Sequence, residues 1–228
     1  MKNESDFNIS FAPRGTGWTI ASLTVNGETT ELRISDCMND LGQVNALLWS
    51  LHHLSIMVDS RCFKFDLVEY VDDVKGFDRY GNPITEENKE DETTWSYVPR
   101  KASFVWDEEG RFSEWIFERD PIPTEEIDFD LHVTLNICHE EDKTYKFGIR
   151  YQKMCYIVAK ACTEMLKKYG YNYYVYSSSE DLSLRSLIFL KAIALNRMDI
   201  LDFEKIDGEE NLYSSSFDKE MALLLEDM

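Results

Sequence analysis

The sequence has no long hydrophobic run. None of its apolar stretches approaches the roughly 20 residues that a helix needs to cross a bilayer. The polar start, Met1-Lys-Asn-Glu-Ser-Asp6, is not followed by the apolar segment of a secretion signal. The five cysteines are widely spaced and odd in number, which indicates free thiols in a reducing compartment: Cys37, Cys62, Cys138, Cys155 and Cys162. These absences predict a cytoplasmic protein without a membrane span.

Several short motifs of catalysis and cofactor binding are also missing. The chain contains no G-x-G-x-x-G, no G-x-x-x-x-G-K-[ST], no G-x-S-x-G and no C-x-x-C. Cys155 and Cys162 fall in an apolar helical stripe, where packing explains them better than nucleophilic chemistry. We therefore expect no cofactor and no metal, and we favour a protein that is not an enzyme.

Positive charge is scarce. The 24 Lys and Arg face 43 Asp and Glu, and the formal net charge is -19 at pH 7. This charge repels phosphate backbones and anionic membrane surfaces, so we expect neither nucleic acid nor membrane as a ligand. It favours docking onto a basic protein. The acids concentrate in residues 72–92 and in residues 199–228.

What the sequence does contain is a regular alternation in residues 127–137. Apolar and polar side chains alternate there without a break, as expected for a strand with one buried face and one wet face. The apolar set is Phe129, Leu131, Val133, Leu135 and Ile137. The overall composition, 43% hydrophobic and 13% aromatic, is typical of a folded globular protein.

The residues before this stretch predict strands and one helix. Residues 7–12 are strand-like, and residues 16–35 form a hairpin around Asn26-Gly27, a pair that favours a type I′ turn. A two-residue turn places Val25 opposite Glu28 and Ala21 opposite Leu32, which gathers the apolar side chains on one face. Residues 61–71 predict another strand, and residues 95–106 and 111–118 predict a second hairpin.

A helix is predicted over residues 40–54. Asp40 and Gln43 have the spacing of a capping box at its start. Its apolar residues recur at helical spacing, and this face would pack on the sheet.

The residues after 140 predict mainly helices. We expect helices over residues 145–169, 182–198 and 217–225, the second opened by a capping box at Ser178 and Asp181. The fold class is α+β, an antiparallel sheet packed on one helix and followed by a helical C-terminal part. We divide the chain into residues 1–140 and 141–228, and leave open whether the second part packs within the same domain.

Two groups of residues are candidate chemical sites. Asp128, Asp130 and His132 share one strand face and would suit a hydrolase or a metal-dependent enzyme. Alternation alone also requires polar residues there, and we prefer that interpretation. A group of aromatic residues on the second hairpin would line a groove or pack across strands, and we prefer packing. That group is Trp95, Phe104, Trp106, Phe112, Trp115 and Phe117.

The first 138 residues resemble a group of small uncharacterised bacterial proteins. The resemblance rests on Gly17-Trp18, Asn26-Gly27, Asp40-Leu41, Trp106 and the strands around Trp115 and residues 127–135. Proteins of this layout are similar to immunity proteins of bacterial toxin systems. The resemblance implies a cytosolic, acidic, non-catalytic binding protein, and it implies no catalytic residue.

Three functional hypotheses follow from the sequence. The leading one is a cytoplasmic immunity or antitoxin protein that neutralises a basic partner, such as a toxin or nuclease, through an acidic loop. The partner-binding residues are predicted to be Asp72, Asp73, Glu86, Glu87, Glu90, Asp91 and Glu92. The alternatives are the enzyme that uses Asp128, Asp130 and His132, and an oligomeric structural module in which the apolar helix after residue 182 forms a homo-oligomer interface.

Overall fold

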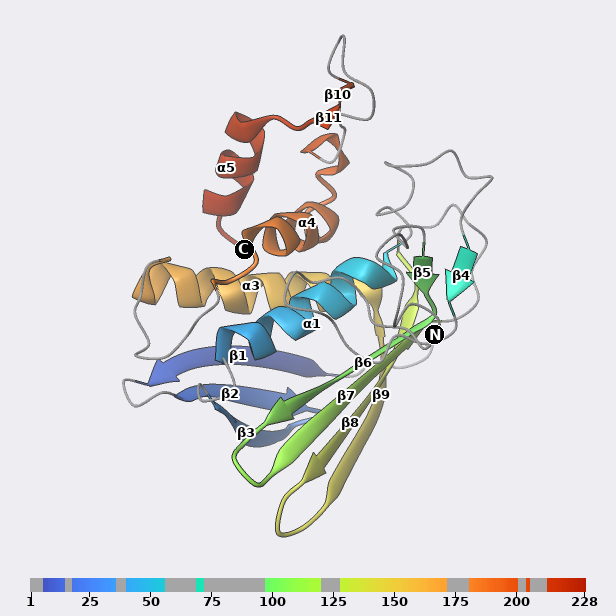
Figure 1. Cartoon of the computed structure of the whole chain (residues 1–228), viewed down its shortest axis with the longest axis vertical. Helices are drawn as coiled ribbons and strands as arrows, with labels where there is room; N and C mark the ends of the chain where they lie inside the picture. Colours follow the sequence, from blue (N-terminus) through green and yellow to red (C-terminus); the bar gives the residue numbers. More distant parts are fainter. Residues whose placement is uncertain are drawn as a thin grey trace, which may run out of the picture.

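Two antiparallel sheets covered by helices form the molecule, which we describe from a computed structural model (Figure 1). The structure describes residues 6–14, 18–35, 40–55, 69–71, 97–119, 128–171, 181–200, 204–205 and 213–228. The first sheet has the strand order β1-β2-β3 and the second the order β6-β7-β8-β9. The predicted α+β class is confirmed.

The first sheet contains β1 (Phe7–Arg14), β2 (Trp18–Val25) and β3 (Glu28–Ser35). Asn26 and Gly27 both have positive φ, 51° and 85°, as a type I′ turn requires. The predicted register is confirmed, with Val25 opposite Glu28. β1 is two residues longer than predicted and includes Pro13, which an edge strand tolerates because one side of its backbone needs no sheet partner.

The second sheet contains β6 (Lys101–Asp107), β7 (Phe112–Arg119), β8 (Asp130–Cys138) and β9 (Lys143–Arg150). Every second residue of β8 from Leu131 to Ile137 is buried, as the alternation predicted. The strand predicted over residues 95–106 is interrupted at Arg100, because Tyr97–Pro99 (β5) pairs in parallel with Glu69–Val71 (β4) instead. Residues 56–68 and 72–96 lie outside the described residues.

The prediction of a helix from residue 145 is wrong at its start. Residues 143–150 form β9, and the helix α3 runs over Tyr151–Tyr169. Tyr145, Phe147 and Ile149 are buried, while the residues between them are exposed. This period of two matches a strand, and pairing with β8 satisfies its backbone. Residues 140–144, where we divided the chain, lie at the turn of the β8–β9 hairpin and the first residues of β9.

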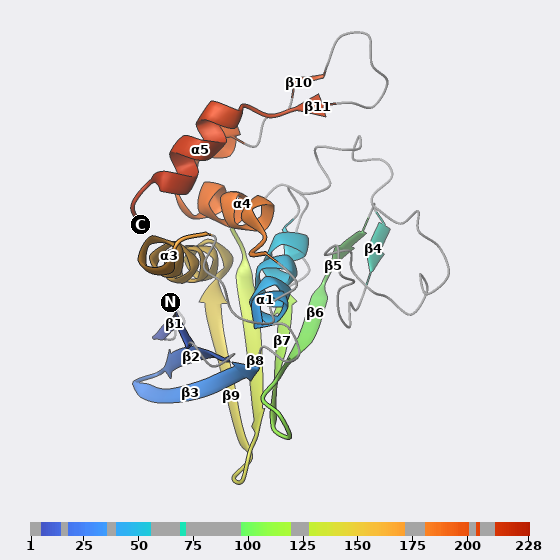
Figure 2. The same cartoon turned by 60° about the vertical axis from the view of Figure 1, so that its left-hand side comes forward.

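The remaining helices pack on the sheets and on one another (Figures 1 and 2). α1 (Asp40–Leu54) contacts β6, and α3 contacts β1. α4 (Leu184–Ala194) lies against both α1 and α3, and α5 (Phe217–Leu225) lies against α4. Three short elements separate α4 from α5 in the chain. They are a 3-10 helix (Met198–Ile200) and two paired strands, β10 (Glu204–Lys205) and β11 (Tyr213–Ser214). The helices predicted over residues 40–54 and 217–225 are confirmed.

α4 is shorter than predicted and begins at a different cap. Its N-cap is Ser183, whose side chain accepts a hydrogen bond from the backbone N–H of Ser186. Ser178, the predicted cap, lies outside the described residues. α4 is largely buried because α1, α3 and α5 lie against it, and burial within the fold is an environment that suits its apolar composition.

The two sheets share one core. Phe7 of β1 stacks on Phe147 of β9 at 5.0 Å between ring centroids, and Phe11 meets the edge of Trp106 at 6.3 Å. A single cluster of buried hydrophobic residues extends from β1 to Leu223 of α5. Within the described ranges, no helix is both long enough and apolar enough to span a membrane.

Candidate interaction surface

The predicted partner-binding loop lies outside the part of the chain that the structure describes. Asp72, Asp73, Glu86, Glu87, Glu90, Asp91 and Glu92 all lie outside the described residues. The described part of the chain contains another cluster of acidic residues, in the turns of two hairpins. Figures 1 and 2 both show the β6–β7 and β8–β9 turns at the same end of the second sheet, away from the helices. Their exposed carboxylates are Glu109, Glu140, Glu141 and Asp142.

A buried carboxylate holds these two turns against the first sheet. Glu108 accepts a hydrogen bond at 3.0 Å from the backbone N–H of Arg33 in β3. Its other oxygen lies 3.0 Å from Nε2 of His139, in the β8–β9 turn. At the surface, Arg111 donates to Glu140 at 2.7 Å. The exposed acids are therefore carried on turns with a fixed mutual arrangement.

Gln43 of α1 connects the turn end of the β6–β7 hairpin to β3. Its amide oxygen accepts from the N–H of Asp107 at 2.5 Å, and its amide nitrogen donates to the carbonyl of Ser35 at 2.9 Å. Its backbone carbonyl also accepts from the indole of Trp106 at 2.7 Å. The side chain of Gln43 therefore joins two sheets, a role that the capping-box spacing did not predict.

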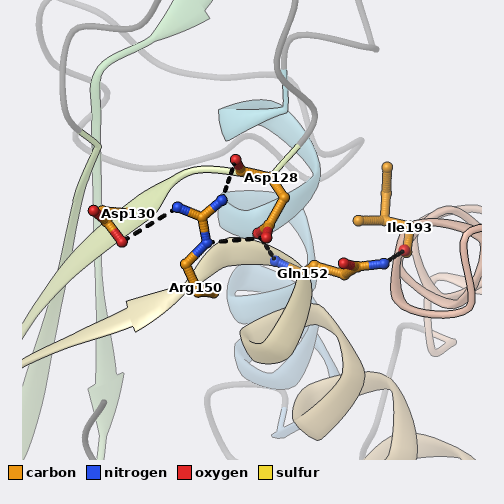
Figure 3. Close-up of polar contacts among 5 residues, drawn as sticks. All are labelled: Asp128, Asp130, Arg150, Gln152 and Ile193. Atoms are coloured by element: carbon orange, nitrogen blue, oxygen red, sulfur yellow. Dashed lines mark hydrogen bonds and ion pairs between the residues drawn. The ribbon is translucent and has the colours of Figure 1, made fainter. Parts of the chain in front are cut away.

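The predicted pair Asp128 and Asp130 meets at Arg150 (Figure 3). The Nε of Arg150 donates to Asp128 Oδ2 at 3.0 Å, and a terminal nitrogen lies 3.4 Å from Asp130 Oδ1. Asp128 Oδ1 accepts from the backbone N–H of Gln152 at 2.9 Å, in the first turn of α3. Both carboxylates thus stabilise the junction between β9 and α3, and Asp128 satisfies an N–H that the helix itself leaves unpaired.

His132 is brought to the same sheet but faces outward. It is exposed on the outer face of β8, opposite Glu118 and Gly148. Among the described residues, no group of three or more His, Cys, Asp or Glu is arranged to hold a metal ion.

The aromatic residues of the second hairpin pack across strands, as preferred from the sequence. Trp106 and Trp115 meet edge to face at 5.1 Å, and Phe104 stacks between neighbours at about 6 Å. These side chains and Phe117 are buried. Phe112 alone among the described members is exposed, at 46%; Trp95 lies outside the described residues.

Sequence reasoning missed a basic segment in this acidic protein. Strand β9 and helix α3 together carry seven bases and one acid, Glu164. The bases are Lys143, Lys146, Arg150, Lys153, Lys160, Lys167 and Lys168. Counting charge along the chain would have found this segment. Most of this basic segment lies along the β9 edge of the sheet and on α3. Acids therefore outnumber bases at the ends of the two hairpins.

Comparison with known proteins gives no relative for this chain. No protein-family model matches it, and neither a curated protein nor a solved structure matches it significantly.

Proposed function

We propose that this protein is a non-catalytic binding protein that neutralises a basic protein partner, in the manner of a cytoplasmic bacterial immunity protein or antitoxin. The observation that carries the proposal is the fixed group of exposed carboxylates at the ends of the β6–β7 and β8–β9 hairpins: Glu109, Glu140, Glu141 and Asp142. The buried contacts of Glu108 hold these turns in place, so the acids need little further ordering when a partner binds.

The charge of the whole chain supports the same function. A net charge of -19 accelerates encounter with a basic surface, and fixed acids on the docking surface set its orientation. Residues 72–92 add a second acidic segment, which would strengthen the long-range attraction of a basic nuclease or toxin to the hairpin-end acids.

The test is capture of the partner from a lysate of the protein's own host. The tagged full chain is immobilised and bound proteins are eluted with a salt gradient. We expect one basic protein, released by salt because screening weakens the attraction between exposed charges. Adding the protein should then block the activity of the captured partner.

Two variants separate the two acidic segments. In the first, Glu109, Glu140, Glu141 and Asp142 are changed to the corresponding amides; in the second, the acids of the predicted loop are changed in the same way. We expect the first variant to lose most of the captured partner. Equal capture by both variants and by the unmodified chain, with unchanged salt dependence, would contradict the proposal.

A further inference from the structure

The outer face of the second sheet carries an exposed apolar group next to the acidic hairpin ends. Val105 of β6 is 51% exposed and Phe112 of β7 is 46% exposed. The strand register places Val105 directly opposite Glu114, with Phe112 and Ile116 on the two diagonals. Diagonal neighbours in an antiparallel pair lie within reach of large side chains. The three apolar side chains therefore surround one carboxylate.

That carboxylate is held in position by a row of polar side chains. Asn136 of β8 donates from Nδ2 to Glu114 Oε2 at 2.8 Å. Thr144 of β9 in turn donates to Asn136 Oδ1 at 3.0 Å. Among the described residues, Asn136 is the one whose hydrogen bond to the Glu114 carboxylate the structure shows. The half-buried carboxylate thus has a fixed orientation and keeps capacity for further donors.

Acids outnumber bases around this group, and the nearest base, Arg111 at the β6–β7 turn, is paired with Glu140. Asp107 and Glu109 lie beside the group at the β6–β7 turn, and Glu140 lies at the neighbouring turn. Two lysines of the outer face lie farther away: Lys146 is on β9, opposite Thr134, and Lys101 is at the far end of β6, opposite Glu118. A positively charged side chain is therefore attracted to the part of the β6–β7 half that lies next to the turn.

We propose that Val105, Phe112 and Ile116 with Glu114 form the docking site for an arginine side chain of the basic partner. This inference rests on the proposed function and names the contact by which it would act. The apolar side chains cover the aliphatic stem of the arginine, and Glu114 accepts hydrogen bonds from its guanidinium. An apolar centre with a polar, charged rim is the usual anatomy of a protein interface.

Arginine suits this site better than lysine for two reasons. Its planar guanidinium donates two parallel hydrogen bonds to one carboxylate, and it stacks on an aromatic face such as that of Phe112. It is also more weakly hydrated than an ammonium group, so transfer next to apolar side chains costs less.

The test measures binding of fluorescein-labelled hexa-arginine to the full chain by fluorescence anisotropy at about 150 mM NaCl, with hexalysine as the comparison peptide. We expect Glu114→Gln to weaken hexa-arginine binding about tenfold. The paired change Val105→Thr with Phe112→Thr should weaken it severalfold without altering any charge. Both variants change exposed or half-exposed side chains, and circular dichroism checks that the fold is kept.

Glu118→Gln is the matched control. Glu118 is exposed on the same face of the same strand but lies opposite Lys101, beyond the apolar group. We expect this variant to bind within about twofold of the unmodified chain. Equal losses for Glu114→Gln and Glu118→Gln, or equal affinity for hexalysine and hexa-arginine, would show that only diffuse charge is recognised and would overturn the arginine site. The lysate capture would still report separately on the proposed function.

Discussion

Lys191 is a buried amine whose surroundings oppose its charge. Its side chain is fully buried, and Nζ donates to the carbonyls of Leu224 and Glu226 at 3.0 Å and 2.7 Å. These carbonyls lie at the C-terminal end of α5, where a helix leaves acceptors unpaired. Burial, and then the charge of Lys167, lower the pKa of Lys191 from its ordinary 10.5 to about 8. A neutral amine still has two N–H groups for the two carbonyls.

This lowered pKa predicts how Lys191 affects stability as pH changes. Between about pH 8 and about pH 10.5 the unfolded chain keeps a proton on Lys191 that the folded chain has released. Stability from this group therefore rises with pH across that window. The destabilisation caused by Lys191→Met should grow by on the order of 2 kcal/mol from about pH 7.5 to about pH 10, measured by urea unfolding.

Lys160→Met provides the control for this pH dependence. Lys160 is only half-buried on α3, lying 5.8 Å from the ring centroid of Tyr156. Both variants replace one lysine by methionine, so other groups that titrate in this range affect every comparison in the same way. The growth of the Lys191→Met difference with pH should exceed any change in the Lys160→Met difference. A Lys191→Met difference that does not change with pH would show that the buried amine is not deprotonated in this window.

The buried cysteines should be chemically inert in the folded protein. Burial raises the pKa of Cys162 to about 12 and raises that of Cys155 further. Because the thiolate is the reactive form, alkylation by iodoacetamide at about pH 8 should be at least about a hundredfold slower than in urea. Peptide mass spectrometry measures both sites, and the half-exposed Cys138 serves as the native-state reference. Labelling of Cys155 or Cys162 as fast as Cys138 would contradict their burial.

At the scale of elements, the junction of β9 and α3 depends on Asp128. Its carboxylate accepts from Arg150 and from the N–H of Gln152 at the start of the helix. A negative charge at this position also interacts favourably with the helix dipole. Asp128→Asn should lower the free energy of unfolding by about 1–2 kcal/mol, measured by urea denaturation.

Asp130→Asn tests whether this effect belongs to the helix start. Asp130 also pairs with Arg150, but at 3.4 Å and with its side chain 57% exposed. Exposed pairs contribute little, so the expected change is within about 0.5 kcal/mol. An equal loss in both variants would show that the ion pair matters and the contact with Gln152 does not.

At the scale of the whole molecule, one core connects the sheets with the C-terminal helices. The buried cluster joins β1, the second sheet, α3, α4 and Leu223 of α5. We therefore predict a single cooperative unfolding transition. All five tryptophans precede residue 140, so tryptophan fluorescence reports on the first part of the chain. Its urea midpoint should equal that of far-ultraviolet circular dichroism, to which the C-terminal helices contribute. Midpoints that differ by more than about 0.3 M would instead indicate separate domains on either side of residue 140.

Charge is also organised over the whole molecule. The bases of β9 and α3 lie on one edge of the second sheet and on a helix beside it, while acids occupy the hairpin ends. If the proposed function holds, a basic partner should approach the hairpin ends and avoid the surface formed by α3 and the rest of β9. The net charge alone does not show how the charges are distributed over the surface, and so does not predict this direction of approach.

The sequence by itself determined the elements whose signals are local. The Asn26-Gly27 turn has the backbone that these two residues favour, and α1 and α5 have the predicted bounds, because turn preference and apolar periodicity act within a few residues. The same holds for the buried alternation of β8. Residues 145–150 were mistaken for helix because their short alternation runs directly into a helical stripe.

Only the tertiary structure decided which distant polar groups meet. Glu108 lies against Arg33, Gln43 against Asp107, and Lys191 against the end of α5, over separations of 33 to 75 residues. No local pattern encodes such contacts, since they depend on how sheets and helices pack. The same packing turns Glu114 toward Asn136 and surrounds it with apolar side chains. The sequence therefore predicted an acidic binding protein, whereas the candidate docking site required the folded arrangement.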